Sequence, residues 1–271
     1  MTPGGTPRQA SRIRQALRRN SSAVLVVFVL LLVWQAAVWL FSIPEYVLPS
    51  PITALGHLFV PQPDAFYNWK LQISTTAFEV LISFAVTAAV GILLAIVIAW
   101  SQWLRNLIMP FFIFVNSLPL IAIAPIILLW FGYGLMTNIL IAFLVSFFPV
   151  IINTTTGLGD VDDDLIDLVR YLHATKWQVF LKIRIPNSLP YIFSGLKIAS
   201  TMCVVGAIVG EFVASDRGLG YIVINSQFTM DTPPIFAALI VVSALGVALF
   251  GVVSLLERVA MPWRQAESLA A

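Results

Sequence analysis

Charged residues are scarce in this chain. Aspartate, glutamate, lysine and arginine account for only 10% of its 271 residues, whereas hydrophobic residues account for 59%, and the mean hydropathy is +0.94. A water-soluble domain of this size would carry roughly a quarter charged residues. The composition therefore excludes a soluble domain and indicates a polytopic membrane protein of the all-α class, for which no nucleic-acid partner is expected.

Cysteine and histidine are almost absent, which excludes two kinds of site. The single cysteine, Cys203, lies in an apolar run and has no partner for an internal disulfide. The two histidines, His57 and His173, have no Cys, His or carboxylate neighbour at ligand spacing. The sequence therefore predicts neither a disulfide nor a metal site.

Motifs for ATP hydrolysis and for other catalysis are also missing. No G-x-x-x-x-G-K-[ST] loop occurs, and the chain contains no Gly-Lys pair. The apolar segments hold no Ser/His/Asp, Cys/His, His/Glu or paired-Asp set. We therefore expect no catalytic residue, no enzymatic activity and no cofactor bound by this chain, and an intramembrane enzyme is the least favoured class.

Long apolar runs are what the chain has instead. A helix needs about 20 mostly apolar residues to cross the hydrocarbon core of a bilayer, and six runs meet this requirement. They extend over residues 23–41, 71–100, 107–131, 135–152, 189–214 and 235–256. The first is longer than the roughly 7 to 15 apolar residues of a signal peptide, so we interpret it as an uncleaved anchor. The membrane domain is expected over residues 23–256.

The distribution of lysine and arginine predicts the orientation of these six spans, because basic residues concentrate on the cytoplasmic side of membrane proteins. With a cytoplasmic N-terminus, thirteen of the fifteen basic residues fall inside. These are Arg8, Arg12, Arg14, Arg18, Arg19, Arg105, Arg170, Lys176, Lys182, Arg184, Lys197, Arg258 and Arg264, whereas Lys70 and Arg217 fall outside. We therefore expect a cytoplasmic N-terminal segment over residues 1–22 and a cytoplasmic tail over residues 257–271.

Prolines predict where regular helix stops. The outer segment over residues 42–70 contains Pro44, Pro49, Pro51, Pro61 and Pro63, and we expect one short helix there, over residues 52–59. The third span contains Pro110, Pro119 and Pro125 together with Asn116, which predict kinks or breaks. A bilayer tolerates such breaks only where protein or a cavity satisfies the freed backbone groups, so this span is a candidate lining of a pathway.

The chain becomes polar between the fourth and fifth spans, over residues 160–186. Asp160, Asp162, Asp163 and Asp164 open this segment and suit a helix start, where negative charge is favoured. An apolar stripe of period 3.6 follows, formed by Leu165, Leu168, Val169, Leu172, Val179, Phe180 and Ile183. Because His-Ala-Thr-Lys at residues 173–176 interrupts the stripe, we expect two short helices joined by a turn, with Pro186 and Pro190 ending the element.

Three roles are open for such a cytoplasmic helix pair. It could lie on the membrane surface, although its mixed aspartate and lysine content suits this poorly. It could pack against the spans of its own chain. It could also insert into a groove of another protein, as amphipathic helices often do.

The same residues carry a resemblance to the cytoplasmic EAA loop of type I ATP-binding-cassette importer permeases. That loop has the pattern E-A-A, three residues, G, nine residues, then I-x-L-P, and this chain keeps every spacing. Asp167 takes the place of Glu, Leu168 and Val169 those of the alanines, His173 that of Gly, and Ile183 and Pro186 belong to the ending. Asp167 shortens the acidic side chain, and His173 removes freedom for a positive φ at the turn.

Longer stretches look like the branch of this family that imports nitrate, taurine, alkanesulfonates and related small molecules. They include LPSPITAL, PLIAIAPIILLWFGYG, FFPVIINTTTGL, ATKWQVFLKIRIPNSLPYIFSGLKIA and GLGYIVINSQF, and the likeness covers residues 46–256. The resemblance implies a permease subunit of the bacterial inner membrane. It would form the path for a small solute, such as a sulfonate, taurine, nitrate, or a pyrimidine or vitamin precursor.

The resemblance also implies partners. An external binding protein would deliver the solute at residues 42–70 and 215–234, and two cytoplasmic ATPase subunits, which hold ATP and Mg²⁺, would drive a pair of permease copies in the lipid bilayer. The ATPase would dock on Asp167, Leu168, Val169, Leu172, His173, Ala174, Trp177, Phe180, Ile183 and Pro186.

Polar residues within the spans are candidates for the translocation path. Glu79 in the second span and Glu211 near the outer end of the fifth are costly to place in a bilayer. Glu79 either bonds to a neighbouring helix or has a functional role. Glu211 either reaches water or pairs with Arg217, or it acts in gating or solute passage. Asn116, Ser117, Asn153 and Met202 either line the path or join helices through polar contacts.

A self-contained secondary transporter or channel is the alternative function. It would need ionisable residues near the midplane for ion or proton coupling, and Glu79 alone offers little of this. No lysine or arginine lies mid-membrane, which weakly disfavours a tight anion site inside the permease.

Overall fold

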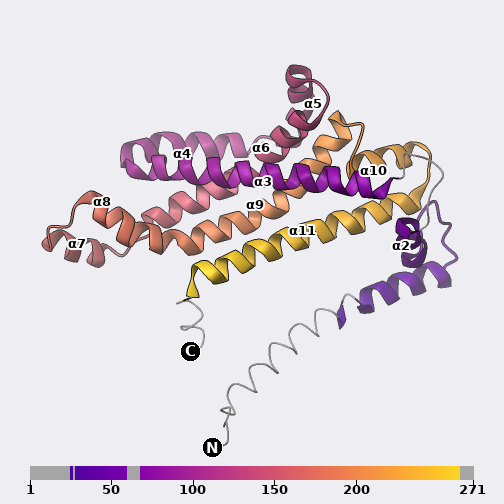
Figure 1. The fold of residues 1–271 in the computed structure, drawn as a ribbon, viewed down its shortest axis with the longest axis horizontal. Helices are drawn as coiled ribbons and strands as arrows, with labels where there is room; N and C mark the ends of the chain where they lie inside the picture. The colour runs from indigo at the N-terminus through magenta and orange to yellow at the C-terminus, as the bar shows by residue number, and fades with distance from the viewer. Residues whose placement is uncertain (1–24, 27, 60–67, 263–271) are drawn as a thin grey trace, which may run out of the picture. The chain divides into compact units, whose positions relative to one another are not determined.

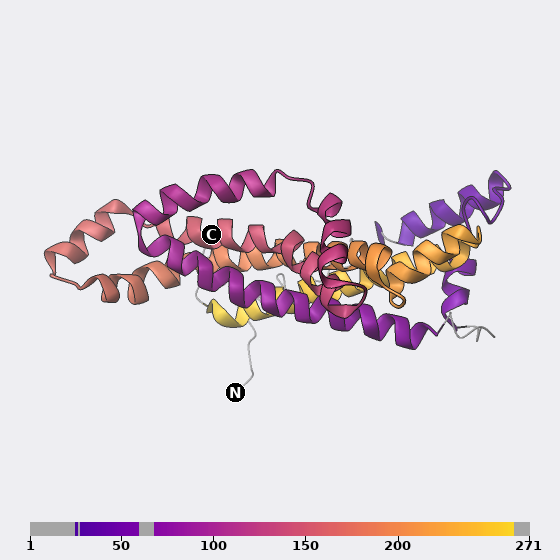
Figure 2. The same ribbon diagram turned by 90° about the horizontal axis from the view of Figure 1, so that it is seen from above.

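The structure is a computed structural model that describes residues 25–26, 28–59 and 68–262. These residues form helices joined by short connections, with no β-strand among them, as Figures 1 and 2 show. A first helix, Phe28–Leu40, carries no label. The labelled helices are α2 (Pro51–Phe59), α3 (Trp69–Trp100), α4 (Gln102–Asn116), α5 (Leu120–Phe131), α6 (Leu135–Gly159), α7 (Asp163–Tyr171), α8 (Lys176–Val179), η2 (Phe180–Arg184), α9 (Ile185–Ala214), α10 (Leu219–Phe228) and α11 (Thr232–Ala260). The predicted all-α class is confirmed.

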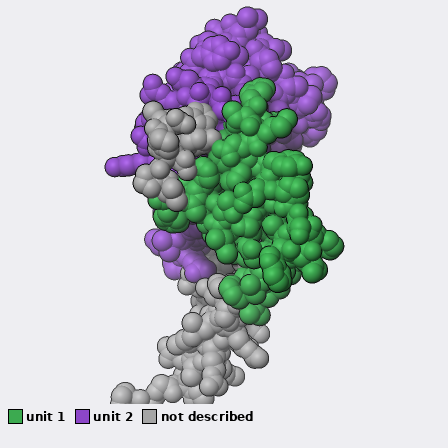
Figure 3. Space-filling view, turned by 90° about the vertical axis from the view of Figure 1, so that its right-hand side faces the viewer, with its two compact units in different colours: residues 1–61, 226–237 green, residues 62–225, 238–271 purple. Residues whose placement is uncertain are grey.

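The chain forms two compact units, which Figure 3 shows in different colours. The first comprises residues 1–61 and 226–237, and the second residues 62–225 and 238–271. In the first unit, Thr232 Oγ1 donates a 2.7 Å hydrogen bond to the Tyr46 carbonyl oxygen. The rings of Trp34 and Phe236 lie 5.4 Å apart. These contacts join the N-terminal part of the chain to the start of α11.

Close packing of α6 against α9 forms the centre of the second unit. A Cβ atom added to Gly206 of α9 would lie 2.6 Å from the Ala142 Cα of α6, so only glycine allows this approach. One added to Gly210 would lie 2.9 Å from the Asn138 Cα. Small residues at helix contacts are typical of membrane proteins, because van der Waals packing holds the helices together in lipid. α3 joins the same core through Val80.

Four helices of the described chain are long and apolar enough to cross a membrane. They are Trp69–Trp100, Leu135–Gly159, Lys176–Ala214 and Thr232–Ala260. α4 and α5 would supply a fifth if the pair counts as one span. The first predicted span is described only in part, by the helix Phe28–Leu40. Six spans and two cytoplasmic termini stay predictions, because residues 1–24 and 263–271, with the basic residues from Arg8 to Arg19 and Arg264, lie outside the described residues.

The third predicted span, residues 107–131, is broken into two helices. α4 and α5 are bent by 96° relative to each other. The break lies at Ser117–Pro119, where proline has no N–H to continue α4, and Ser117 Oγ donates a 2.9 Å hydrogen bond back to the Ile113 carbonyl. Pro110 and Pro125 lie inside α4 and α5. A break was predicted here, and its sharpness makes the span two separate helices.

The described part of the outer segment agrees with its proline pattern. Residues 41–50 form no helix, and α2 follows over nearly the predicted range. Ser50 starts α2, since its Oγ accepts a 3.0 Å hydrogen bond from the Thr53 N–H, and Pro51 occupies the first helical position, where its missing N–H costs nothing. Pro61 and Pro63 lie outside the described residues.

Candidate functional site

The polar segment after α6 folds as the short helix α7 and a turn that leads into α8 (Figure 1). The expected turn between two helices is present, although α8 is not a separate short helix but the start of a longer one. Asp162 caps α7, because its carboxylate accepts a 2.9 Å hydrogen bond from the Asp164 N–H. Thr175 caps α8 in a capping box with Gln178, whose side chain accepts a 2.8 Å hydrogen bond from the Thr175 N–H. Such caps satisfy the N–H groups that a helix start leaves free. Both helix starts are therefore encoded locally.

The turn between α7 and α8 places His173 in the left-handed region, at φ +57°. The His173 N–H donates to the Arg170 carbonyl at 2.9 Å. The Ala174 N–H donates to the Val169 carbonyl at 3.0 Å, a bond typical of helices that end in a left-handed residue. His173 Nδ1 also lies 2.9 Å from the Tyr171 carbonyl oxygen. The position that has Gly in the EAA pattern thus keeps the positive φ, and histidine reaches it with a local hydrogen bond.

The prediction that Pro186 and Pro190 end this element is wrong. The chain runs from α8 through the π-helical turn η2 into α9, so Lys176–Ala214 is one helix. The Ile185 N–H donates to the carbonyl of Phe180, five residues back. This wider turn accommodates the ring of Pro186, which has no N–H to donate. Pro190 lies one turn further along, inside α9.

The turn divides the predicted apolar stripe into an exposed part and a buried part. Leu168 and Leu172 are 57% and 72% exposed. Phe180 is only 5% exposed, and its ring lies 5.1 Å from that of Trp100 and 6.1 Å from that of Trp177. The exposed apolar residues from Leu165 to Trp177 are named the loop patch here and comprise Leu165, Leu168, Tyr171, Leu172 and Trp177.

The other predicted coupling residues lie around this patch with differing exposure. Asp167 and Pro186 are exposed, whereas Val169, Ala174 and Ile183 are half-buried. Asp167 Oδ1 pairs with Arg170 Nη1 at 3.1 Å, and both side chains are exposed. Exposed ion pairs stabilise a fold by less than about 1 kcal/mol, so this pair leaves Asp167 open to a partner.

Sequence patterns do not single out the residues that anchor the base of the loop. Asn187 of α9 donates a 2.5 Å hydrogen bond to the Asp160 carbonyl oxygen, and the Tyr191 hydroxyl donates to the Asp160 carboxylate. The guanidinium group of Arg105, from α4, lies against Gly159 at the end of α6. A cation at a helix C-terminus is favourable. These contacts hold the loop against three helices of the second unit.

The predicted path residues do not come together in one pocket. Asn116 and Ser117 are exposed at the break between α4 and α5, and Met202 is exposed on α9. Asn153 is half-buried and donates a 2.8 Å hydrogen bond to the Pro149 carbonyl within α6. None of these four residues is among the described residues that line the pocket near Glu79, which is described at the end of this section. Their part in the path stays a prediction.

Glu211 lies in a polar network at the opposite end of α9 from the loop. It is fully buried, with 0% exposure. Its Oε1 accepts a 2.5 Å hydrogen bond from Thr76 Oγ1 of α3, and its Oε2 accepts one of 2.5 Å from the Gly220 N–H. The hypothesis that Glu211 reaches water or pairs with Arg217 is wrong, because the loop folds back over it and Arg217 pairs with Asp216 at 3.8 Å. A role in gating stays a prediction.

Glu79 belongs to the same network and is also buried. Its Oε1 accepts a 2.9 Å hydrogen bond from Asn138 Nδ2 of α6, which confirms the hypothesis of a bond to a neighbouring helix. Gln72 lies on the same face of α3, and its Oε1 accepts a 2.6 Å hydrogen bond from the Gly218 N–H. Gly218 has φ +103°, a conformation that glycine adopts easily. The network ties α3 to α6, α9 and the start of α10.

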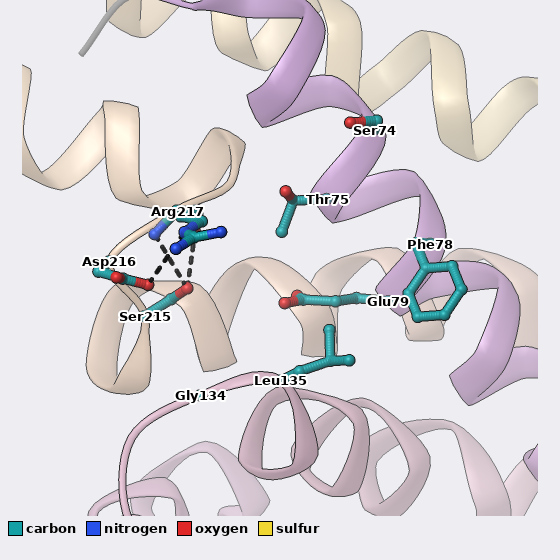
Figure 4. Close-up of a pocket in the computed structure, with 9 residues that line it drawn as sticks. All are labelled: Ser74, Thr75, Phe78, Glu79, Gly134, Leu135, Ser215, Asp216 and Arg217. Carbon is teal, nitrogen blue, oxygen red and sulfur yellow. Dashed lines mark hydrogen bonds and ion pairs between the residues drawn. The ribbon is translucent and has the colours of Figure 1, made fainter. Parts of the chain in front are cut away.

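A pocket of about 480 Å³ borders this network (Figure 4). Its polar and aromatic lining includes Thr75, Phe78, Glu79, Ser215, Asp216 and Arg217. Figure 4 shows Ser215, Asp216 and Arg217 grouped on one loop, with Phe78 and Glu79 on α3. The pocket thus offers a cation, carboxylates, hydroxyl groups and an aromatic ring to a small polar solute.

Comparison with known proteins gives a family match and full-length relatives. The family model described as "Binding-protein-dependent transport system inner membrane component" matches residues 88–260. The chain is 31% identical to the formylaminopyrimidine transport permease protein ThiX of Halalkalibacterium halodurans, over 89% of this chain and 95% of the relative. It is 31% identical to the riboflavin transport system permease protein RibX of Chloroflexus aurantiacus, over 94% and 96%. It is 29% identical to the nitrate import permease protein NrtB of Synechocystis, over 89% of each.

The family match extends from within α3 to the end of α11 and includes the capped loop and Glu211, whereas Gln72, Thr76 and Glu79 lie before it. The helical fold, the helices that are long and apolar enough to cross a membrane, and the relatives all indicate a membrane transport protein. This chain therefore belongs to the family of binding-protein-dependent transport system inner membrane components and is the membrane-spanning permease subunit of an ATP-binding-cassette importer.

Proposed function

We propose that the loop patch docks on a separate cytoplasmic ATPase subunit and that this contact drives transport. The observation that carries the proposal is the exposure of Leu168, Leu172 and Trp177 on a loop whose helices are capped and whose base is anchored. Exposed apolar side chains on a fixed scaffold are typical of protein contact sites. On this proposal the chain has no enzymatic activity, and ATP and Mg²⁺ bind to the ATPase.

Docking transmits motion because the loop is continuous with a membrane helix. α8, η2 and α9 form one helix from Lys176 to Ala214, so a displacement of the loop moves α9 with it. Two ATPase subunits that close around ATP must favour the outward-facing permease by a few kcal/mol, since a ligand shifts an equilibrium only by its differential affinity. Rigid-body rotation of subunits is a common form of such a change.

We also propose that two copies of the chain enclose the solute path along a twofold axis. All residues of α4 are described, and none of them is buried within the chain. This leaves a full helix face for a second copy or for lipid. The proposed path includes Asn116, Ser117, Asn153, Met202 and Glu211, and an external binding protein delivers the solute from the outer side.

We infer that the solute belongs to the pyrimidine and vitamin-precursor class rather than to nitrate or the sulfonates. The two relatives at 31% identity are named as transport permeases for a formylaminopyrimidine and for riboflavin. The outer pocket supports this class, because Phe78 offers a ring to stack on and Asp216 an exposed carboxylate that accepts N–H groups. Lys197 of α9 is not free to hold an anion, since it pairs with Glu257 of α11.

The docking proposal is tested by copurification and by uptake into proteoliposomes. Leu172→Asp should abolish copurification of the ATPase and ATP-driven uptake, because it places a charge in the loop patch, whereas the volume-conserving Leu172→Met should retain both. Phe180 is unsuitable for this test, since it is buried against Trp100 and a charge there would disrupt the loop itself. Unchanged copurification of Leu172→Asp would refute the docking surface. Uptake by the chain alone, driven by a proton or sodium gradient, would support the secondary transporter instead.

The solute class is tested on the external binding protein that delivers the solute to this permease. Calorimetric titration should give tight binding of an aminopyrimidine or a flavin and no binding of nitrate, taurine or an alkanesulfonate. Tight binding of one of these anions would reject the inferred class and leave the docking proposal intact.

A further inference from the structure

A second pocket, of about 360 Å³, lies between the loop and the connection from α3 to α4. Its apolar wall includes Trp100, Val179 and Phe180. Its polar wall includes three cations, Arg170, Lys176 and Arg184. No carboxylate occurs among the described residues that line it. The pocket therefore combines an aromatic wall with a concentration of positive charge.

The cations of this pocket are poorly neutralised by the protein. Arg170 pairs with Asp167 on the exposed surface, and a guanidinium group has five N–H donors, so most of them stay free. Lys176 and Arg184 make no ion pair within the described part of the chain. Cations held together without a counter-charge repel one another, so binding of an anion here relieves this repulsion.

The pocket opens where the membrane surface is expected. Trp100 ends α3, and Trp103 follows at the start of α4 with 71% of its surface exposed. Tryptophan is enriched at membrane interfaces. Leu93 and Val97 precede Trp100 on α3 and are exposed apolar residues, so acyl chains can lie along α3 directly below the pocket. A water-soluble anion has no apolar part that could contact these residues of α3.

We propose that this pocket binds the phosphate headgroup of an anionic phospholipid of the cytoplasmic leaflet. The phosphate contacts Arg170, Lys176 and Arg184, and the acyl chains lie against α3. Basic pockets on the cytoplasmic side of membrane helices suit anionic headgroups, because charge and position both match.

The lipid and the proposed ATPase would contact different faces of α7. At 3.6 residues per turn, Ile166 and Arg170, which line the pocket, lie roughly 150° around the helix from the centre of the stripe of Leu165, Leu168 and Leu172. The two surfaces therefore do not overlap on α7, whereas Trp177 of the loop patch packs against Trp100 and Phe180 of the pocket wall. Lipid binding does not depend on the docking proposal. A headgroup held between the loop and the α3–α4 connection joins the coupling element to the membrane surface.

Native mass spectrometry of the full chain in detergent tests the proposal, with phosphatidylglycerol and phosphatidylcholine as probes. The chain should retain phosphatidylglycerol at least tenfold more than phosphatidylcholine. The double variant Lys176→Gln, Arg184→Gln should lower this affinity by about 25-fold, since each basic residue near an anionic surface contributes about a fivefold factor. The control Lys182→Gln, Arg258→Gln removes the same charge from exposed cytoplasmic positions outside the pocket and should change the affinity by less than twofold.

Two outcomes would overturn the proposal, and a third would mean that the lipid and the ATPase exclude each other. An equal loss in both double variants would mean that net charge attracts the lipid without a site. Equal retention of the two lipids, with displacement by inorganic phosphate, would assign the pocket to a soluble anion. Loss of phosphatidylglycerol when the purified ATPase is added would mean that the ATPase covers the pocket. The melting temperatures of both double variants should be unchanged, which shows that a loss of lipid binding is not caused by unfolding.

Discussion

The left-handed conformation of His173 predicts an order of stability for substitutions at this position. A residue other than glycine costs about 1 to 3 kcal/mol in this region. Histidine, with its local hydrogen bond, lies near the lower end of this range, and a β-branched residue lies near the upper end because its side chain is crowded by the backbone. His173→Val also loses the contact of Nδ1 with the Tyr171 carbonyl, which contributes about 0.5 kcal/mol at an exposed site. We expect His173→Val to destabilise the turn by about 2 kcal/mol relative to histidine.

His173→Gly is expected to be nearly neutral, although it restores the residue of the EAA pattern. Relief of the left-handed strain contributes about 1 kcal/mol. The greater freedom of glycine in the unfolded chain costs about 0.4 to 1 kcal/mol, and the lost hydrogen bond costs about 0.5 kcal/mol. These contributions cancel to within about 0.5 kcal/mol, so histidine and glycine are equivalent solutions for this turn.

Hydrogen exchange of the Ala174 amide measures this order, because that N–H donates to the Val169 carbonyl only when the turn is closed. After correction for intrinsic rates, exchange should be about 30-fold faster in His173→Val, since 1.4 kcal/mol corresponds to a factor of ten. In His173→Gly it should stay within about threefold of the natural protein. Exchange of the valine variant at the natural rate would refute the positive φ as a requirement of the loop.

Two further substitutions test the packing of the spans through the melting temperature of the purified chain. Gly206→Ala should lower the melting temperature, because the added Cβ would lie 2.6 Å from the backbone of α6 and overpacking costs about 1 to 3 kcal/mol. The control Gly251→Ala meets no atom within 4 Å and should not lower it. Equal effects of the two substitutions would contradict the close contact of α6 and α9. Thr76→Val should lower the melting temperature by leaving the buried carboxylate of Glu211 without its hydroxyl donor, at a cost of about 1 to 3 kcal/mol. Thr75→Val, whose hydroxyl bonds only within α3, is the control, and a matching loss there would argue against the network.

Local signals predicted much of the fold and of the loop. Pro119 stops α4 because the missing N–H is a property of the residue itself. Asp162 and Thr175 cap their helices through bonds to residues two or three positions away, so the start of each short helix could be inferred from sequence. The docking of an ATPase on this loop depends on the surface of a second protein, so it stays a prediction.

Features that depend on distant contacts could not be predicted in the same way. Pro186 continues the helix only because η2 widens the preceding turn. Glu211 is buried because the loop at Gly218 folds back over it and supplies backbone donors. Phe180 follows the same period as Leu172, yet the turn directs it against Trp100 of α3. For Glu211 and Phe180 a decisive neighbour, Thr76 or Trp100, lies far away in sequence, whereas the wide turn before Pro186 is local but is not marked by a sequence signal.

The uninterrupted helix from Lys176 to Ala214 has a mechanical consequence. Its 39 residues extend over about 58 Å at a rise of about 1.5 Å per residue, and a tilt of about 10° around its middle would move each end by about 5 Å. If the ATPase docks as proposed, this helix would act as a lever arm with the loop at one end and the buried acid Glu211 near the other. A push on the loop that tilts the helix around its middle would then move the far end as well, without any relay of side chains between them.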